Sequence, residues 1–220
     1  MRLSFLLLAA LMTAGAHAQS AQAVTDATIE AQAKIDDAIP VVEKMKADPQ
    51  VSELLHKARG VVIVPHYLQA ALVFGGRGGS GVLLVRQEKH WSDPAFYKIG
   101  GGSFGAQIGG TKGALVFLLM SDKAVDAFEN KSSTWSMDAG AGLAAVNYSR
   151  QTPDSQTLSD VIVWSDTKGL FGGAAVGANK VSRDLAANQV YYNNKDITAQ
   201  QILSGGATNP KAQPLVNVLP

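Results

Sequence analysis

Twelve of the 22 glycines in this chain lie between residues 75 and 113, inside short apolar runs with the composition of β-strands. Glycine weakens a strand and usually marks a bulge, a tight bend or a close approach of another backbone. Because so many glycines occur together, we expect a tightly curved sheet that carries small side chains. This region constrains the fold more than any other part of the chain.

Helical patterns flank the glycine-rich region. In residues 25–46 apolar side chains recur every three or four positions, and Pro40 is predicted to kink or divide this helix. Asp48 before a proline is a typical helix start, and Thr198 opens a last helix through a Thr-x-x-Gln capping box. We expect strands at residues 61–64, 71–74, 82–86, 104–108, 114–120 and 160–164.

The predicted strands follow one another too closely for helical crossovers, which favours antiparallel pairing. The sequence therefore predicts an α+β fold: a glycine-rich, mainly antiparallel curved sheet or barrel-like core with helices at the N- and C-terminal ends. We expect a signal peptide at residues 1–18, a single domain at residues 19–206 and a flexible tail at residues 207–220, which contain three prolines.

The first residues have the features of a secretory signal peptide. Arg2 precedes an apolar run at residues 3–12, and Ala-His-Ala at residues 16–18 fits a cleavage site. The apolar run is too short to span a bilayer, and a lipid-anchored export signal needs a cysteine, which the chain lacks. We expect a periplasmic or secreted protein that has neither a lipid anchor nor a transmembrane helix.

Charge is distributed unevenly along the chain. Residues 57–123 contain eight Lys and Arg against three Asp and Glu, a net charge of +5, whereas residues 19–56 contain three against seven, a net charge of −4. The glycine-rich region is therefore the basic one, and a basic field favours anionic partners. The bases are dispersed and not interleaved with stacking aromatics, so we expect no nucleic-acid partner.

Two motifs resemble catalytic ones but lack the required context. The G-x-G-x-x-G pattern at residues 76–81 needs a following helix, and the sequence predicts a strand there. The G-x-S-x-G pattern around Ser103 also needs a helix, and no histidine follows it. A triad of another order, with His66 or His90, Asp93 and Ser103, stays open. No spacing fits a metal-ligand set. We predict a non-enzymatic protein with no cofactor.

Several motifs occur in a fixed order along the chain. They are Ala-Arg-Gly-Val-Val-Ile-Val-Pro at residues 58–65, Phe-Gly-Gly-Arg-Gly-Gly-Ser-Gly at 74–81, Trp-Ser-Asp-Pro-Ala-Phe at 91–96, Gly-Gly-Ser-Phe-Gly-Ala-Gln-Ile-Gly at 101–109, Val-Phe-Leu-Leu-Met at 116–120 and Lys-Gly-Leu-Phe-Gly-Gly at 168–173. Through this ordered set of motifs, the chain resembles the SYLF domain family, also called the yeast actin-binding-domain family. The resemblance covers nearly the whole chain after the predicted signal peptide.

The resemblance implies a non-enzymatic, lipid-binding module of the exported bacterial type. Eukaryotic relatives bind phosphoinositides with the help of an amphipathic N-terminal helix, and some bind actin. Here the N-terminal helix is acidic, which suits an anionic membrane poorly. An exported protein also meets neither actin nor, normally, phosphoinositides, so we do not expect actin to be a partner.

We predict that anionic phospholipid headgroups contact Arg77, Arg86, Lys89 and Lys112, because the basic excess coincides with glycine-rich strands whose N–H groups can meet phosphate. The alternative is a structural or protein-interaction module of the periplasm with no lipid ligand, in which these bases are solvated. A small outer-membrane barrel fits poorly with 15 aromatic residues and helical ends. Nothing in the sequence indicates an oligomeric state.

The signal-peptide interpretation predicts a mature protein that begins near Gln19 and is released from its native host by osmotic shock. N-terminal sequencing by mass spectrometry checks it. An intact Met1 on the protein from its native host, or recovery only in the cytoplasmic fraction, would contradict it.

Overall fold

The computed structural model describes residues 3–71, 74–88, 90–104, 109–130, 135–136, 143–144, 161–166 and 180–220. Their elements follow in the order α1 (Leu3–Lys46), α2 (Pro49–Lys57), β1 (Gly60–Ala71), β2 (Phe74–Val85), β3 (Ala95–Phe104), β4 (Gly109–Leu119), α3 (Asp122–Asn130), β5 (Trp135–Ser136), β6 (Leu143–Ala144), β7 (Val161–Ser165), β8 (Lys180–Arg183), α4 (Leu185–Tyr191), α5 (Ala199–Leu203), η1 (Pro210–Ala212) and α6 (Gln213–Val218).

The described strands form one sheet in the order β5-β8-β3-β2-β1-β4-β7-β6. Every neighbouring pair is antiparallel except β6 and β7. β4 returns to lie beside β1, so the four long central strands have the order of a Greek key. The predicted α+β class and the mainly antiparallel sheet are confirmed. Over the described residues the sheet is open and has two edges, so it does not close into a barrel.

Helices cover both faces of the central strands in the half of the sheet that contains residues 60–64 of β1. Val61 and Ile63 of β1 point into a cluster with α1, α2, α4 and α6, whereas Val62 and Val64 point into a second cluster with α3 and α5. This alternation is the period of two of an extended strand. Both faces are buried here, which explains why residues 61–64 form a continuous apolar run.

A β-bulge separates this covered half from the rest of the four strands. Pro65 and His66 of β1 lie opposite the single residue Ala114 of β4, so β1 has one extra residue. Proline cannot donate to the ladder and is found in sheets mainly at edges and bulges. The imidazole Nε2 of His66 lies 3.0 Å from a carboxylate oxygen of Asp37, which ties the bulge to α1.

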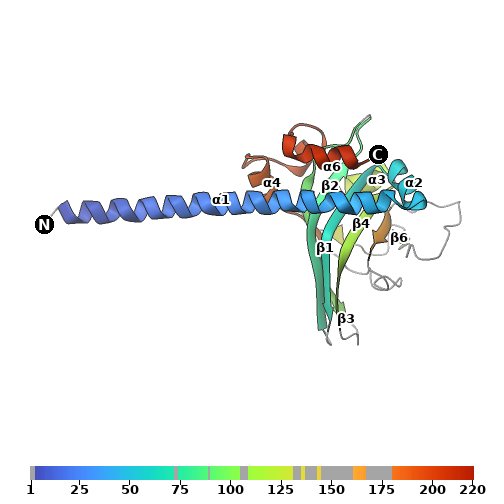
Figure 1. The fold of residues 1–220 in the computed structure, drawn as a ribbon, viewed down its shortest axis with the longest axis horizontal. Coiled ribbons are helices and arrows are strands. Elements are labelled where there is room, and N and C mark those ends of the chain that lie inside the picture. Colours follow the sequence, from blue (N-terminus) through green and yellow to red (C-terminus); the bar gives the residue numbers. More distant parts are fainter. Residues whose placement is uncertain are drawn as a thin grey trace.

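Beyond the bulge, residues 67–71, 74–80, 98–104 and 109–113 of β1–β4 form a projection that we call the finger. Figure 1 shows these strand ends extending past the helices, away from α1 and α6. The side chain of Leu68 is accordingly exposed.

Two glycines of β2 pack directly against the bulge. A Cβ at Gly81 would overlap the carbonyl oxygen of Ile63, and one at Gly79 would lie 2.7 Å from the carbonyl oxygen of His66. The expected close approach of backbones is therefore real at these positions. Gly76, farther along the same strand, has no heavy atom within 4 Å of an added Cβ, so packing does not explain its glycine.

The N-terminal helix agrees with its sequence pattern except at Pro40. Ala31, Ile35 and Val42 are fully buried, as the spacing predicts. Helix α1 nevertheless continues through Pro40, which neither breaks nor divides it. Figure 1 shows that the N-terminal half of α1 extends beyond the rest of the fold.

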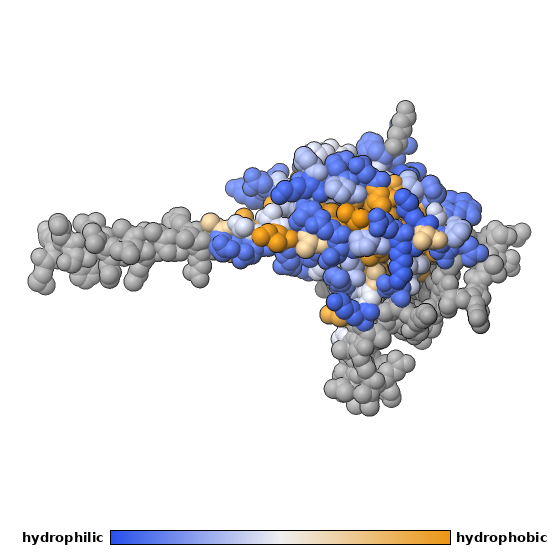
Figure 2. Space-filling model, viewed as in Figure 1, coloured by the Kyte–Doolittle hydropathy of each residue, from blue (hydrophilic) through white to orange (hydrophobic). Residues whose placement is uncertain are grey.

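The expected flexible tail at residues 207–220 was wrong. These residues form η1 and α6, which lie against α1, and Leu215 is fully buried. Trp91 and Arg86 both donate to the carbonyl oxygen of Pro220, at 2.8 and 2.9 Å. The burial of Leu215 and Leu219, which are spaced four residues apart, outweighs the tendency of the prolines to break structure. Figure 2 shows an apolar strip between α1 and α6.

The glycine packing generates a prediction with an internal control. We expect Gly81→Ala to lower the free energy of unfolding by about 1–3 kcal/mol, because its Cβ overlaps a backbone that must move. Gly76→Ala, in the same strand, should change it by less than about 1 kcal/mol and can raise it, because alanine reduces the entropy of the unfolded chain. Urea denaturation measures both, and equal effects would contradict this packing.

Candidate functional site

Lys112 lies in the middle of the finger on an uncovered face. Its partner in the ladder is Leu68 of β1, which pairs on its other side with Gly78 of β2. Gly78 in turn pairs with Gly100 of β3. Directly opposite residues share a face of a sheet, so this row presents one lysine and one leucine beside two glycines. The Lys112 side chain is exposed.

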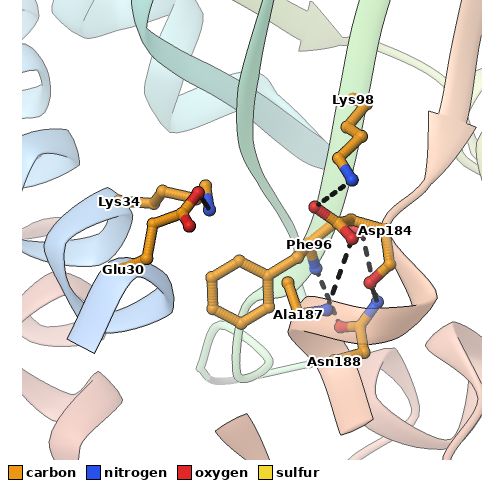
Figure 3. Close-up of polar contacts among 7 residues, drawn as sticks. All are labelled: Glu30, Lys34, Phe96, Lys98, Asp184, Ala187 and Asn188. Atoms are coloured by element: carbon orange, nitrogen blue, oxygen red, sulfur yellow. Dashed lines mark hydrogen bonds and ion pairs between the residues drawn. The ribbon is translucent and has the colours of Figure 1, made fainter. Parts of the chain in front are cut away.

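Lys98 lies on the same face, two rows closer to the helices. Its Nζ forms a 3.1 Å ion pair with Asp184, whose carboxylate also accepts from the backbone N–H of Ala187 at the start of α4 (Figure 3). Asn188 bonds both the N–H and the carbonyl oxygen of Phe96. Lys98 is therefore partly neutralised, and it helps to fix α4 to β3 at the base of the finger.

The register places Arg77 on the adjacent row. It lies opposite Gln69 of β1 and Gly101 of β3, whereas Lys112 lies opposite Leu68. Adjacent rows of a sheet belong to opposite faces. The positions of Arg77 and Lys112 are therefore on the two different faces of the finger.

Arg86 has a structural environment. Its guanidinium donates to the carbonyl oxygens of Ala58, Leu55 and Pro220 at 2.9–3.1 Å and lies 4.2 Å from the ring centre of Trp91. Burial lowers the pKa of this guanidinium, with a smaller contribution from nearby Arg59. These contacts hold the guanidinium on the helical side of the molecule. Arg86 directly follows β2, at the end of that strand farthest from the finger. We therefore leave Arg86 out of the candidate site.

Lys89, the fourth predicted headgroup contact, lies outside the described residues. Sequence reasoning missed Leu68 and Lys98 as members of the exposed face. Lys98 could have been found, because it flanks the uncharged stretch 99–111 on one side as Lys112 does on the other. Leu68 could not, because its exposure depends on where the helices end.

The apparent catalytic motifs lie in strands. Residues 76–81 are part of β2, which continues to Val85 without a helix, and Ser103 lies in β3. The ring of His66 faces Asp37 rather than Asp93, and Asp93 accepts from the backbone N–H of Asn209 at 2.5 Å. Burial raises the pKa of the Asp93 carboxyl, and the Asn209 hydrogen bond opposes this rise.

The part of the chain that the structure describes contains no group of three or more His, Asp or Glu side chains placed to hold a metal ion. None of its helices is both long and apolar enough to cross a membrane. The aromatic side chains of Trp91 and Phe96 are buried in the core, not at an interface.

The fold and the site define an α+β sheet protein whose candidate site is an exposed, glycine-rich sheet surface. Residues 100–220 match the family described as Ysc84, "Las17-binding protein actin regulator". This match covers more than half of the chain, so the chain belongs to this family, the SYLF family that its motifs resemble.

Curated relatives match over 76% of this chain. Protein YSC84 of Saccharomyces cerevisiae is 30% identical over 173 residues, which are 36% of its length. SH3 domain-containing protein PJ696.02 of Schizosaccharomyces pombe is 34% identical, over 40% of its length, and SH3 domain-containing YSC84-like protein 1 of Bos taurus is 29% identical, over 50%. The chain thus spans about a third to a half of these relatives. No solved structure matches it.

The Arg86 environment predicts a stability effect without a binding effect. Arg86→Lys keeps the charge but cannot reach three separate carbonyls, so we expect a loss of about 1–3 kcal/mol of unfolding free energy. Urea denaturation measures this loss. Binding to anionic vesicles, measured below the unfolding transition, should stay unchanged. A variant of normal stability with reduced vesicle binding would return Arg86 to the site.

Proposed function

We propose that this protein is a non-enzymatic lipid-binding module of the cell envelope, which contacts anionic phospholipid headgroups through the finger. Lys112 and Arg77 are the principal contacts. One observation carries the proposal: an exposed lysine lies beside an exposed leucine and two glycines on a sheet surface that no described helix covers. Such a surface lets a charged partner approach the backbone closely.

The attraction in this proposal is local. Residues 57–123 carry a net charge of +5 although the whole chain carries only +1. A basic side chain near an anionic membrane contributes about 1 kcal/mol, and salt screens this contribution beyond about 10 Å at 0.1 M. Binding through a few finger residues is therefore weak to moderate and sensitive to salt.

Helix α1 does not fit the role of membrane contact between residues 31 and 45. Its apolar face there is already buried against the sheet, where Ala31, Ile35 and Ala38 are inaccessible. The rest of this segment carries two Lys against three Asp and Glu, and its Lys34 is paired with Glu30 at 2.8 Å. We therefore assign the membrane contact to the finger and not to this segment.

The proposed location is the periplasm or the exterior of the cell, because the first 18 residues have the pattern of a signal peptide. We propose no actin-related role for this chain. Its relatives' family carries the description "actin regulator", but an exported protein does not meet actin.

A protein-interaction module is the second candidate. The names of relatives favour this candidate. LAS seventeen-binding protein 3 of Saccharomyces cerevisiae, which is 30% identical over 174 residues, is named for binding another protein. In that case the finger face would contact a periplasmic protein, and phospholipid would not compete for it.

Flotation with vesicles tests the proposal. Vesicles rich in phosphatidylglycerol should bind the protein more tightly than phosphatidylcholine vesicles, and added salt should reduce the difference. Because two bases contribute about 2 kcal/mol, Arg77→Glu with Lys112→Glu should weaken binding about 30-fold or more. The matched control is Lys195→Glu with Lys211→Glu, which reverses two exposed charges outside the finger and should leave binding unchanged.

Equal flotation with neutral and anionic vesicles at low salt would contradict the electrostatic mechanism. Equal losses in the finger and control variants would show that net charge, and not this surface, determines binding. Absence of binding to any vesicle would favour the protein-interaction candidate.

A further inference from the structure

Two stretches of the chain at the finger lack charged residue types, and basic residues flank each of them: one stretch runs from β1 into β2 and the other from β3 into β4. Residues 67–76 and 99–111 contain no Asp, Glu, Lys, Arg or His. The first residues of these five types on either side are His66 and Arg77 around one stretch and Lys98 and Lys112 around the other. His66 faces Asp37 and Lys98 pairs with Asp184, so we define the basic collar as Arg77 and Lys112.

The structure brings the two uncharged stretches to the same place. Ala71 of β1 pairs with Gly109 of β4, and Phe74 of β2 pairs with Phe104 of β3. The four strands therefore end side by side at the far end of the finger, as Figure 1 shows. Leu68, three residues before the end of β1, is 55% exposed there.

The two principal bases lie one row apart in depth, on opposite faces. Arg77 is three residues from the start of β2, and Lys112 is three residues from the start of β4. Their rows are adjacent in the ladder and belong to different faces. A membrane lying flat against one face of the finger can meet only one of these positions. A membrane that the finger enters by its end meets both at the level of the headgroups.

We propose that the finger enters an anionic bilayer end-on, with Leu68 and the basic collar of Arg77 and Lys112 at the level of the headgroups. This inference rests on the proposed lipid-binding function and specifies its geometry. Apolar side chains gain free energy on leaving water, whereas unpaired backbone groups are costly in hydrocarbon. Entry is therefore shallow and limited to the interfacial region.

Single-cysteine labelling tests this geometry, because the natural chain contains no cysteine. An environment-sensitive fluorophore is attached in the variant Leu68→Cys or in the control Leu185→Cys. The control is matched, since Leu185 is 56% exposed and lies at the start of α4, at the base of the finger and not near its end. With phosphatidylglycerol vesicles we expect a blue shift and quenching by lipid-borne quenchers at position 68 and neither at position 185.

The unlabelled pair Leu68→Ser and Leu185→Ser gives an independent readout, with thermal melting to show that both variants fold. We expect about a tenfold loss of vesicle affinity for Leu68→Ser and none for Leu185→Ser, since burial of a leucine contributes about 1.5–3 kcal/mol when complete. Flotation of the labelled proteins is measured in parallel.

The outcomes separate this inference from the function on which it rests. Vesicle binding with no spectral change at position 68 and an unaffected Leu68→Ser variant would overturn end-on entry and leave lipid binding intact. A shift at position 185 alone would assign the contact to the helical side. Failure of every variant and of the natural chain to float with vesicles would overturn both.

Discussion

Pro65 interrupts the pairing of β1 with both of its neighbours, and the rest of the architecture depends on how the sheet accommodates that interruption. One extra residue in β1 forms a bulge, and Gly79 and Gly81 of β2 allow the neighbouring backbone to close over it. On one side of the bulge, helices bury both faces of the sheet. On the other side the strands project as the finger. The same local irregularity thus marks the boundary between the core that stabilises the fold and the surface proposed to bind lipid.

Much of the fold could be predicted because its signals are local. The capping residue Asp48 accepts from the backbone N–H groups of Gln50 and Val51, and Thr198 forms the complete capping box that its sequence indicates. The spacing of Ala31, Ile35 and Val42 gave the buried face of α1 correctly. The glycine cluster indicated close backbone contact, which Gly79 and Gly81 show.

The candidate site was harder to predict because it depends on register. A shift of one residue exchanges the faces of a strand, and the bulge at Pro65 introduces such a shift. Arg77 and Lys112 therefore could not be assigned to faces from the sequence alone. Arg86 binds carbonyl groups as distant in sequence as Pro220, which no local pattern reveals. The C-terminal residues looked like a tail because three prolines masked the apolar pair Leu215 and Leu219.

The central claim is that the finger, and not helix α1, contacts the membrane. Hydrogen–deuterium exchange of the natural chain, with and without phosphatidylglycerol vesicles, tests it most directly because it reports on every segment at once. The account predicts slower exchange in peptides covering residues 67–80 and 98–113 and unchanged exchange across residues 25–46. Protection confined to residues 25–46, with the finger unaffected, would contradict it.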